Sequence, residues 1–368
     1  MSHDLESALR AQLEAYVDPY LDRSLGFVKA VGGIQLGDAA APQVSPQIDI
    51  ELPYPSGRYH AKLSTDLMLL LEEKCGVQDA VVSVSQKISA HSVQKGVKRI
   101  DQIHNIIAVA SGKGGVGKST TSVNLALALA SDGASVGLLD ADIYGPSQPR
   151  MMSLSGQPDS TDGKTLQPKI NYGIQTMSMG FLVEEDKPTI WRGPMVTQAL
   201  EQLLMMTQWQ DLDYLVVDLP PGTGDTQLTL AQKVPVSGAV IVTTPQDIAL
   251  VDARKGLKMF ETVDVPVLGI VENMSYHRCV DCGREEHFFG RGGGQRLADE
   301  VGVELLGALP LDVSICEQAD SGKPTVVAEP DSVISDLYRE IARKTSARLS
   351  LRSKDYSTKF PNIVIQNS

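Results

Sequence analysis

A glycine-rich segment constrains the fold of this sequence more than any other feature. It reads Ser-Gly-Lys-Gly-Gly-Val-Gly-Lys-Ser-Thr from Ser111 to Thr120 and fits the pattern G-x-x-x-x-G-K-[ST]. An apolar run, Ile106–Ala110, precedes it, and a stretch with helical periodicity, Ser119–Ala130, follows it. A loop that joins a strand to a helix in this way binds phosphate groups at the carboxyl end of the strand. The segment therefore predicts an α/β fold with a phosphate site at this loop.

The residue types in the loop suit a nucleoside triphosphate and its metal ion. Glycine has no Cβ, so backbone N–H groups can converge on phosphate oxygens, and the following helix directs its positive N-terminal end at the same anion. We expect Lys118 to contact the β and γ phosphates of ATP and the Ser119 hydroxyl to bind Mg²⁺. A turn that only links strand to helix is the alternative. The predicted nucleotide contacts are Gly112, Lys113, Gly114, Gly115, Val116, Gly117, Lys118, Ser119 and Thr120.

Two further strands end in carboxylates. Asp140 and Asp142 close one apolar run, and Asp218 closes another, Tyr214–Asp218. Because the carboxyl ends of parallel strands meet at one edge of a sheet, these acids should lie near the phosphates. We expect Asp218 near Mg²⁺ and either Asp140 or Asp142 to orient the attacking water; solvated strand ends are the alternative. The next segment, Leu219–Asp225, has the stiff prolines and flexible glycines of a switch that senses the γ-phosphate.

Apolar runs alternate with helical patterns through the rest of this region. Such alternation is typical of a mostly parallel sheet that helices cover on both faces, the architecture of a P-loop NTPase. Further strands are expected at Ser135–Leu139, Ile174–Met179, Ala239–Thr243, Val267–Val271 and Leu305–Leu309. Further helices are expected at Met195–Thr207, Ile248–Val263, Gln295–Val301 and Asp331–Leu349.

A smaller α/β domain is expected in front of this one, at residues 1–90. Its helices are predicted at Leu5–Val17 and Arg58–Lys74, and its strands at Phe27–Val31, Gln47–Leu52 and Ala80–Val84. Residues 91–104 have the polar, basic composition of a linker. The nucleotide-binding domain then takes residues 105–350, and 351–368 form a polar tail.

Charge and hydropathy limit the partners and the compartment. The net charge of −12 over 368 residues opposes binding to nucleic acid or to anionic membranes. A local basic run, Lys95, Lys98 and Arg99, is typical of a solvated linker. The N-terminus lacks the apolar core of a signal peptide, and no apolar window is long enough to span a membrane. We therefore expect a cytoplasmic protein in which reducing conditions leave the cysteines free to bind metal.

The cysteine pair Cys279-Val-Asp-Cys282 lies in a polar stretch, residues 275–294. Two residues between the thiolates let both face one metal centre, but Zn²⁺ or a [4Fe–4S] cluster generally needs four ligands. Cys75 and Cys316 are solitary and are expected to be structural, so a homodimer that pools two pairs is the economical solution. A zinc knuckle has the same spacing. A dithiol redox site is disfavoured by Asp281 and by the absence of a helix start, and unliganded cysteines are the remaining alternative.

The loop resembles the deviant Walker A motif of dimeric ATPases that include nitrogenase iron protein and the Min and Par positioning ATPases. The resemblance rests on Lys113 in the form Lys-Gly-Gly-Val-Gly-Lys. It implies that Lys113 reaches across a two-fold interface to the partner's nucleotide and neutralises charge that develops during phosphoryl transfer. An exposed, inert lysine is the alternative.

The sequence as a whole is similar to the Mrp/ApbC-type iron–sulfur cluster carriers. The resemblance implies a homodimer that hydrolyses ATP slowly, binds a labile [4Fe–4S] cluster through Cys279 and Cys282 of each subunit, receives it from a donor scaffold and transfers it to apo iron–sulfur proteins. It also implies that Asn273 contacts the adenine edge and that Pro310 packs near the base. The matching segments are Ser111–Thr120, Leu138–Ser147, Trp191–Pro194, Asp218–Asp225, Val271–Ser275 and Cys279–Cys282.

Two departures and two alternative functions qualify this resemblance. The small domain is similar to that of the MIP18 group of iron–sulfur assembly factors, but Pro53-Tyr-Pro55 lacks a nearby cysteine that some of them carry. Cys316 stands where relatives often carry an arginine. A Min/Par-like positioning ATPase with a structural zinc at the cysteine pair is one alternative function. A metabolic kinase or ligase with bound zinc is another, although no substrate pocket for it is evident.

Overall fold

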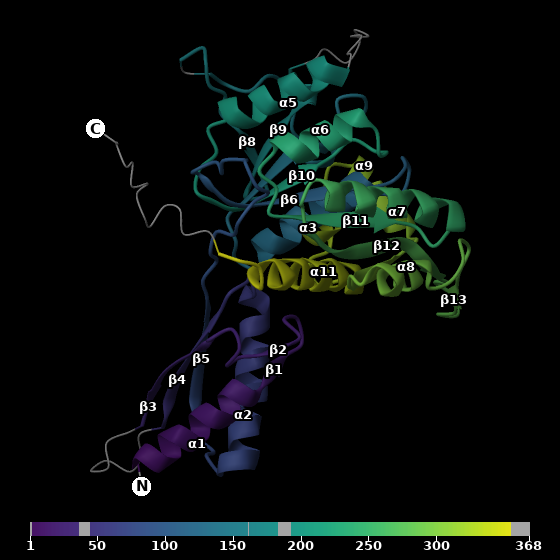
Figure 1. Cartoon of the computed structure of the whole chain (residues 1–368). Coiled ribbons are helices and arrows are strands. Elements are labelled where there is room, and N and C mark those ends of the chain that lie inside the picture. The colour runs from purple at the N-terminus through teal and green to yellow at the C-terminus, as the bar shows by residue number, and fades with distance from the viewer. Residues whose placement is uncertain (1, 37–44, 161, 183–192, 355–368) are drawn as a thin grey trace, which may run out of the picture.

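A mostly parallel β-sheet forms the centre of the larger part of this protein (Figure 1). The computed structural model describes residues 2–36, 45–160, 162–182 and 193–354. Within these residues the sheet has nine strands in the order β13-β12-β11-β6-β10-β7-β9-β8, with β14 paired to β12. The β8–β9 and β12–β13 pairs are antiparallel and the others are parallel. The strands are β6 (Ile103–Ala110), β7 (Val136–Asp140), β8 (Lys169–Asn171), β9 (Ile174–Ser178), β10 (Leu212–Asp218), β11 (Gly238–Thr243), β12 (Val267–Arg278), β13 (Glu285–Glu286) and β14 (Leu305–Pro310).

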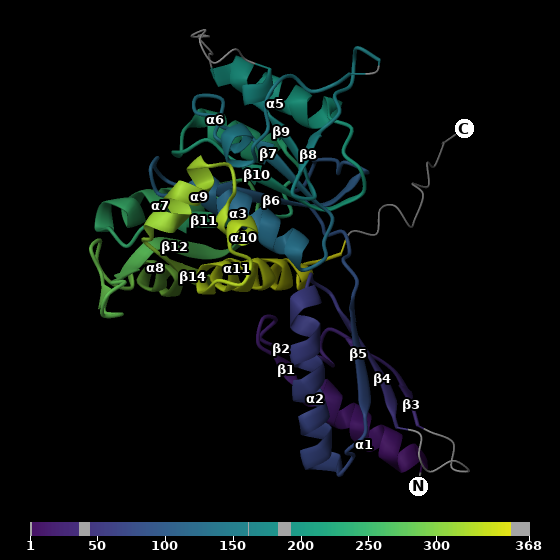
Figure 2. The ribbon, with the colours of Figure 1, turned by 180° about the vertical axis from the view of Figure 1, so that it is seen from behind.

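Helices cover both faces of this sheet, which confirms the predicted fold class. One face packs against α5 (Gly193–Met206), α6 (Asp225–Lys233), α7 (Asp247–Thr262) and α8 (Gly293–Val301). The opposite face packs against α3 (Lys118–Ser131), α4 (Gln148–Met151), α9 (Val313–Asp320), α10 (Thr325–Ala328) and α11 (Val333–Ser350), and Figure 2 shows most of these helices from their own side. The strands between them are almost continuously apolar because a parallel sheet of this kind is buried on both faces.

A second, smaller layer lies beside α11 (Figure 1). Its sheet has the order β3-β4-β5, with β3 (Val31–Gln35) antiparallel and β5 (Val81–Gln86) parallel to β4 (Gln47–Leu52). The helices α1 (Ser2–Ala15) and α2 (His60–Cys75), the latter preceded by η1 (Gly57–Tyr59), bury leucines against this sheet. A short hairpin joins β1 (Val17–Asp18) and β2 (Arg23–Ser24). Ala347 of α11 also belongs to this apolar core, so the small layer packs directly on the larger one.

An ion pair of the large layer, Asp132 with Arg343, also bonds to the small layer. Asp132 is the C-cap of α3 and accepts hydrogen bonds from the Arg343 guanidinium at 2.7 and 3.1 Å. The same carboxylate accepts from the backbone N–H of Arg58 at 3.1 Å, and the Asp132 carbonyl accepts from Gly57 N–H at 3.0 Å. Arg343 also donates to the Tyr20 hydroxyl at 3.1 Å. The helix that begins at the phosphate loop therefore ends on the small layer.

The structure corrects several predicted elements. The strand predicted at Phe27–Val31 is wrong because residues 25–29 form turns, with Lys29 at a φ of 56°, and the strand begins at Val31. β12 continues to Arg278, well past the predicted end at Val271. The short elements β8, α4, α6, α9 and α10 had no predicted counterpart. Most other elements match their predictions within a few residues, while Trp191 and the tail after residue 354 lie outside the described residues.

Candidate nucleotide site and cysteine hairpin

The phosphate loop has the backbone geometry that its glycines predict. Gly115 and Gly117 have φ values of 79° and 80°, which side chains other than glycine rarely adopt. A Cβ at Gly112 would lie 2.2 Å from the Asp252 backbone carbon, so only glycine lets the loop approach α7 this closely. Gly117 is the N-cap of α3, and the helix directs its N-terminal N–H groups toward the loop.

Lys118 lies at the centre of a buried polar network. Its ammonium donates to an Asp218 carboxylate oxygen at 2.6 Å and to the Ser119 hydroxyl at 3.2 Å. Asp218 also accepts from the Ser122 hydroxyl at 2.8 Å and from the Gln148 amide at 3.0 Å. With Asp218 fully buried and Lys118 almost so, each charge is satisfied by the other. The fold thus brings the loop lysine, the loop serine and the acid at the end of β10 together.

The two acids at the end of β7 have different surroundings. Asp140 is fully buried and its carboxylate accepts from Asp142 N–H, Gln148 N–H and the Ser178 hydroxyl at 3.0–3.1 Å. Burial, with the nearby charge of Asp218, raises the pKa of Asp140 to about 7. Asp142 lines the cavity beside the loop, and burial raises its pKa while the charge of Lys118 opposes that rise. Asp142 is therefore the acid placed to meet a ligand, and Asp140 organises the loop behind it.

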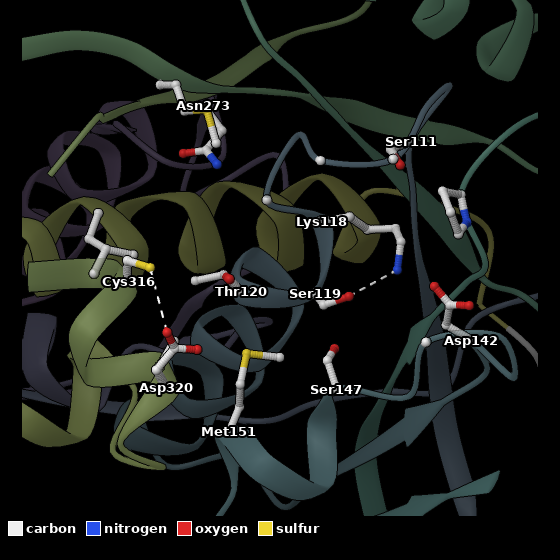
Figure 3. A pocket seen from close by; sticks show the side chains of 18 of the residues that line it. Ser111, Lys118, Ser119, Thr120, Asp142, Ser147, Met151, Asn273, Cys316 and Asp320 are labelled. Atoms are coloured by element: carbon white, nitrogen blue, oxygen red, sulfur yellow. Dashed lines mark hydrogen bonds between the residues drawn. The ribbon is translucent and has the colours of Figure 1, made fainter. Parts of the chain in front are cut away.

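A cavity of about 750 Å³ opens over the phosphate loop (Figure 3). Lys118, Ser119 and Asp142 line one side of it, and Figure 3 shows Cys316 on the other side. Asn273 lies nearer to Cys316 than to Asp142 in this view. The cavity also reaches Met274, Pro310, Leu311 and Asp320. Its size suits a small-molecule ligand that extends from the loop toward β14 and α9.

Asn273 bonds directly to the phosphate loop. Its side-chain amide donates to the Val116 carbonyl at 2.9 Å, and a Cβ on Gly117 would lie 2.1 Å from the amide nitrogen. The next residue, Met274, has a φ of 55°, and the pairing of β12 with β14 is irregular between Glu272 and Tyr276. This irregularity turns Asn273 and Met274 toward the cavity, as bulges at functional sites commonly do.

Lys113 and the segment after β10 form another wall of the cavity. The Lys113 ammonium is 3.4 Å from the Gln246 side-chain oxygen at the start of α7. Pro221 also lines the cavity, and the adjacent Gly222 N–H donates to the Ser111 carbonyl at 3.0 Å. The predicted switch segment therefore contacts the phosphate loop directly before α6 begins at Asp225.

Cys279 and Cys282 lie in a tight turn between β12 and β13. The turn is closed by hydrogen bonds from Gly283 N–H to the Cys279 carbonyl and from Cys279 N–H to the Arg284 carbonyl, both 2.9 Å. The backbone N–H groups of Cys282 and Asp281 lower the pKa of the Cys279 thiol. The backbone N–H of Asp281 thus favours the Cys279 thiolate, whereas Asp281 was expected to disfavour it. Both thiols are accessible, Cys282 more so than Cys279.

The neighbouring histidines support the hairpin. His277 lies within β12, where a ring nitrogen is 3.1 Å from the Leu311 carbonyl and the ring stacks on Phe288. A His287 ring nitrogen is 2.9 Å from the Ser275 carbonyl. Within the part of the chain that the structure describes, no three His, Cys, Asp or Glu side chains gather as metal ligands would. One chain thus offers two accessible thiols at this place.

Comparison with known proteins identifies the family. A family model described as the NUBPL iron-transfer P-loop NTPase, of the ParA group, matches residues 102–346. The chain belongs to this family. The iron-sulfur cluster carrier protein of Escherichia coli K12 is 46% identical over 346 residues, which cover 94% of this chain and 92% of that protein. The iron-sulfur cluster transfer protein NUBPL of Mus musculus is 54% identical, over 68% of this chain and 80% of that protein.

A solved structure agrees with this family assignment. A nucleotide-binding protein of Archaeoglobus fulgidus, in complex with ADP, is 39% identical with a TM-score of 0.56 and covers 64% of this chain and 91% of that one. The iron-transfer P-loop NTPase family thus accounts for the large layer. No helix among the described residues is long and apolar enough to cross a membrane.

Two contributors to this site were not predicted from the sequence. Gln148 bonds to both Asp218 and Asp140, and its only signal is its place at a helix start just after β7. Cys316 was expected to be structural, but it is exposed on α9 and lines the cavity, 3.9 Å from an Asp320 oxygen. Cys316 is about 200 residues from the phosphate loop in the sequence, and only the folded sheet brings the two to one cavity.

Proposed function

We propose that this member of the iron-transfer family binds and slowly hydrolyses Mg²⁺·ATP, and carries a labile [4Fe–4S] cluster between two identical subunits to recipient apo-proteins. One observation carries the proposal: the paired thiols of Cys279 and Cys282 sit at the end of the strand that holds Asn273 against the phosphate loop. A thiol pair and a nucleotide site that share one strand are what an ATP-dependent cluster carrier requires.

The loop side chains divide the work on the nucleotide. When phosphates enter, Lys118 can exchange Asp218 for the β and γ phosphates, because its ammonium already lies among the loop donors. The Ser119 hydroxyl and the Asp218 carboxylate are oxygen donors of the kind Mg²⁺ prefers, and they would hold it. When bound, the metal ion would neutralise charge on the phosphates. Asp142, which faces the cavity, orients the attacking water.

In this proposal the adenine base of ATP lies at the end of the cavity away from Lys118 and Asp142. Asn273, Pro310 and Cys316 all line the cavity, and Figure 3 shows Asn273 and Cys316 on the side away from Asp142. The Asn273 amide nitrogen already donates to Val116, so its carbonyl oxygen is the atom left to accept from an adenine amino group. An adenine base held there would contact β12 at Asn273. A shift of this strand on nucleotide binding would then move the cysteine hairpin at its end.

Two chains are needed because one chain supplies too few ligands. A [4Fe–4S] cluster takes four thiolates, and Cys279 and Cys282 provide two. The thiols are accessible and the Cys279 thiol has a lowered pKa, so a second hairpin can meet them as thiolates. A cluster at such an interface can leave when the subunits move apart. The same interface would bring Lys113 to the partner's nucleotide.

The names of the similar proteins favour this function over a positioning ATPase. Relatives from Pseudomonas fragi and Escherichia coli, 56% and 46% identical, are both called iron-sulfur cluster carrier proteins.

We also propose the division into a small domain at 1–90, a linker at 91–104, an ATPase domain at 105–350 and a tail at 351–368, and a cytoplasmic location. The separate apolar core of the small layer supports its status as a domain.

Anaerobic reconstitution with iron and sulfide tests the proposed cargo. The wild type should take up about two irons and two sulfides per chain and absorb in the thiolate-to-iron charge-transfer region. Cys279→Ala and Cys282→Ala should each lose the absorption, while Cys75→Ala, a cysteine far from the hairpin, should keep it. Wild-type protein that binds Zn²⁺ but no iron would point to the zinc alternative. Protein that forms a Cys279–Cys282 disulfide and binds neither would point to a redox dithiol.

A further inference from the structure

A second cavity, of about 610 Å³, lies where the small layer meets the large one. The end of β4, the turn before β3 and the residues after β5 form one wall, and residues 99–104 and Lys354 form the other. It is separate from the nucleotide cavity, with which it shares no lining residue. The function proposed above does not use it.

Cationic side chains from distant parts of the sequence gather in this cleft. Lys29, Lys87, Arg99 and Lys354 line it, against two acids, Glu51 and Asp101. His104 also lines it and faces Asp213 at 3.4 Å. In a chain of net charge −12, a local excess of positive charge stands against the overall balance.

Three of these cations have no ionic partner in the part of the chain that is described. Lys29, Lys87 and Lys354 are exposed, and no carboxylate of the described residues forms an ion pair with them. The turn that carries Lys29 is fixed by hydrogen bonds from Lys29 N–H to the Gly26 carbonyl and from Ala30 N–H to the Leu25 carbonyl. The cleft thus presents ammonium groups without ionic partners, one of them on a hydrogen-bonded turn.

The arrangement favours an extended acidic chain over a small phosphate. A phosphate site gathers backbone N–H groups or arginine forks on one point, whereas lysines are separate, strongly hydrated point charges. Here they come from both walls of a cleft large enough for several residues. Carboxylates on alternate residues of an extended peptide lie about 7 Å apart and can meet such separated ammonium groups.

We propose that this cleft binds an extended acidic segment of a partner protein. Carboxylates of the segment pair with Lys29, Lys87 and Lys354, while the half-buried Pro53 and Ile88 contact its backbone and apolar atoms. The binding needs neither nucleotide nor metal, so it stands or falls separately from the carrier function. The net negative charge of the rest of the chain confines acidic segments to this cleft.

A binding measurement with a defined peptide tests this inference. The probe is a fluorescein-labelled octapeptide that alternates glutamate and serine, followed by fluorescence anisotropy without nucleotide. Lys29→Glu with Lys87→Glu should weaken binding roughly tenfold, because two pairs become repulsions. The matched control, Lys95→Glu with Lys98→Glu, makes the same change of net charge on exposed lysines outside the cleft and should weaken binding less than about twofold.

Three outcomes would overturn the proposal. Equal weakening in both double variants would mean non-specific attraction. A peptide with glutamine in place of glutamate that binds as tightly would remove the charge recognition. Inorganic tripolyphosphate that binds the wild type more tightly than the peptide, and loses binding only in the cleft variant, would make this a small-phosphate site. Far-UV circular dichroism of each variant confirms that it is folded.

Discussion

The carboxylates at the end of β7 show how neighbouring residues of one type take different tasks. The Asp140 carboxylate accepts hydrogen bonds from three donors of the protein itself, whereas Asp142 lines the cavity. From the sequence the two acids were indistinguishable, because both follow the same strand. Only the path of the loop after β7, which folds Gln148 back onto Asp140, separates them.

Removal of the Asp142 charge should affect turnover more than binding. In Asp142→Asn we expect ATP hydrolysis to fall about 10²-fold or more, because the attacking water loses its base, while nucleotide affinity changes only a few-fold. Phosphate release and equilibrium binding of a labelled nucleotide measure the two effects. Hydrolysis at the wild-type rate would remove Asp142 from the reaction.

Asp140 should make stability depend on pH. Its pKa is raised from 3.8 to about 7 in the folded state, so the stabilisation from its bound proton is complete below about pH 4 and is lost as pH rises through about 7. Asp140→Asn keeps a neutral side chain at every pH. In thermal unfolding without nucleotide, the melting temperature of the variant should therefore rise relative to that of the wild type between pH 4 and pH 8. A constant difference across that range would contradict the assigned environment.

At the scale of elements, α3 and β12 connect the phosphate loop to distant parts of the protein. α3 runs from Lys118 to the C-cap at Asp132, where it meets the small layer. β12 runs past the loop at Asn273 to the cysteine hairpin. Both elements were predicted, α3 to within one residue at each end, but the C-terminal end of β12 was not. The predicted strand stops at Val271 because polar residues follow. In the structure these residues continue β12, because they pair with β14 and β13.

The Asp132–Arg343 pair should behave as one coupled unit. Each single change, Asp132→Ala or Arg343→Ala, leaves a buried charge unpaired and should lower the free energy of unfolding by about 3 kcal/mol. The double variant should lose far less than the sum, since the second change removes that unpaired charge. Urea unfolding of the three variants and the wild type gives the coupling energy. Additive losses would show that the two side chains act independently.

Over the whole molecule, local sequence patterns predict some features of the structure, and long-range contacts determine the others. The sheet, its helices and the phosphate loop could be predicted because apolar periodicity and glycine placement are local. The false strand at Phe27–Val31 is also local in origin: its apolar residues alternate poorly and Lys29 turns the chain. The contacts of Gln148, Cys316 and the lysine cleft join segments far apart in sequence, and no local pattern encodes them.

Subunit mixing tests whether two chains build each ATP site. Lys113→Ala should bind nucleotide but lose most hydrolysis, as should Asp142→Asn. If Lys113 acts on the partner's nucleotide, a mixed dimer has one site with both groups intact. Random pairing of equal amounts should then restore about one quarter of wild-type turnover, since half of the dimers are mixed and each has one good site. No recovery, with exchange shown by sizing tagged chains, would place Lys113 in its own site.

Native mass spectrometry under anaerobic conditions shows directly whether two chains share one cluster. After reconstitution with iron and sulfide, we expect a species of two chains with one [4Fe–4S] cluster, and a single chain without metal when Cys279 and Cys282 are both changed to alanine. A reconstituted wild type that remains a single chain while it carries iron and sulfide, or a dimer that holds only zinc, would contradict the shared cluster on which the proposed function rests.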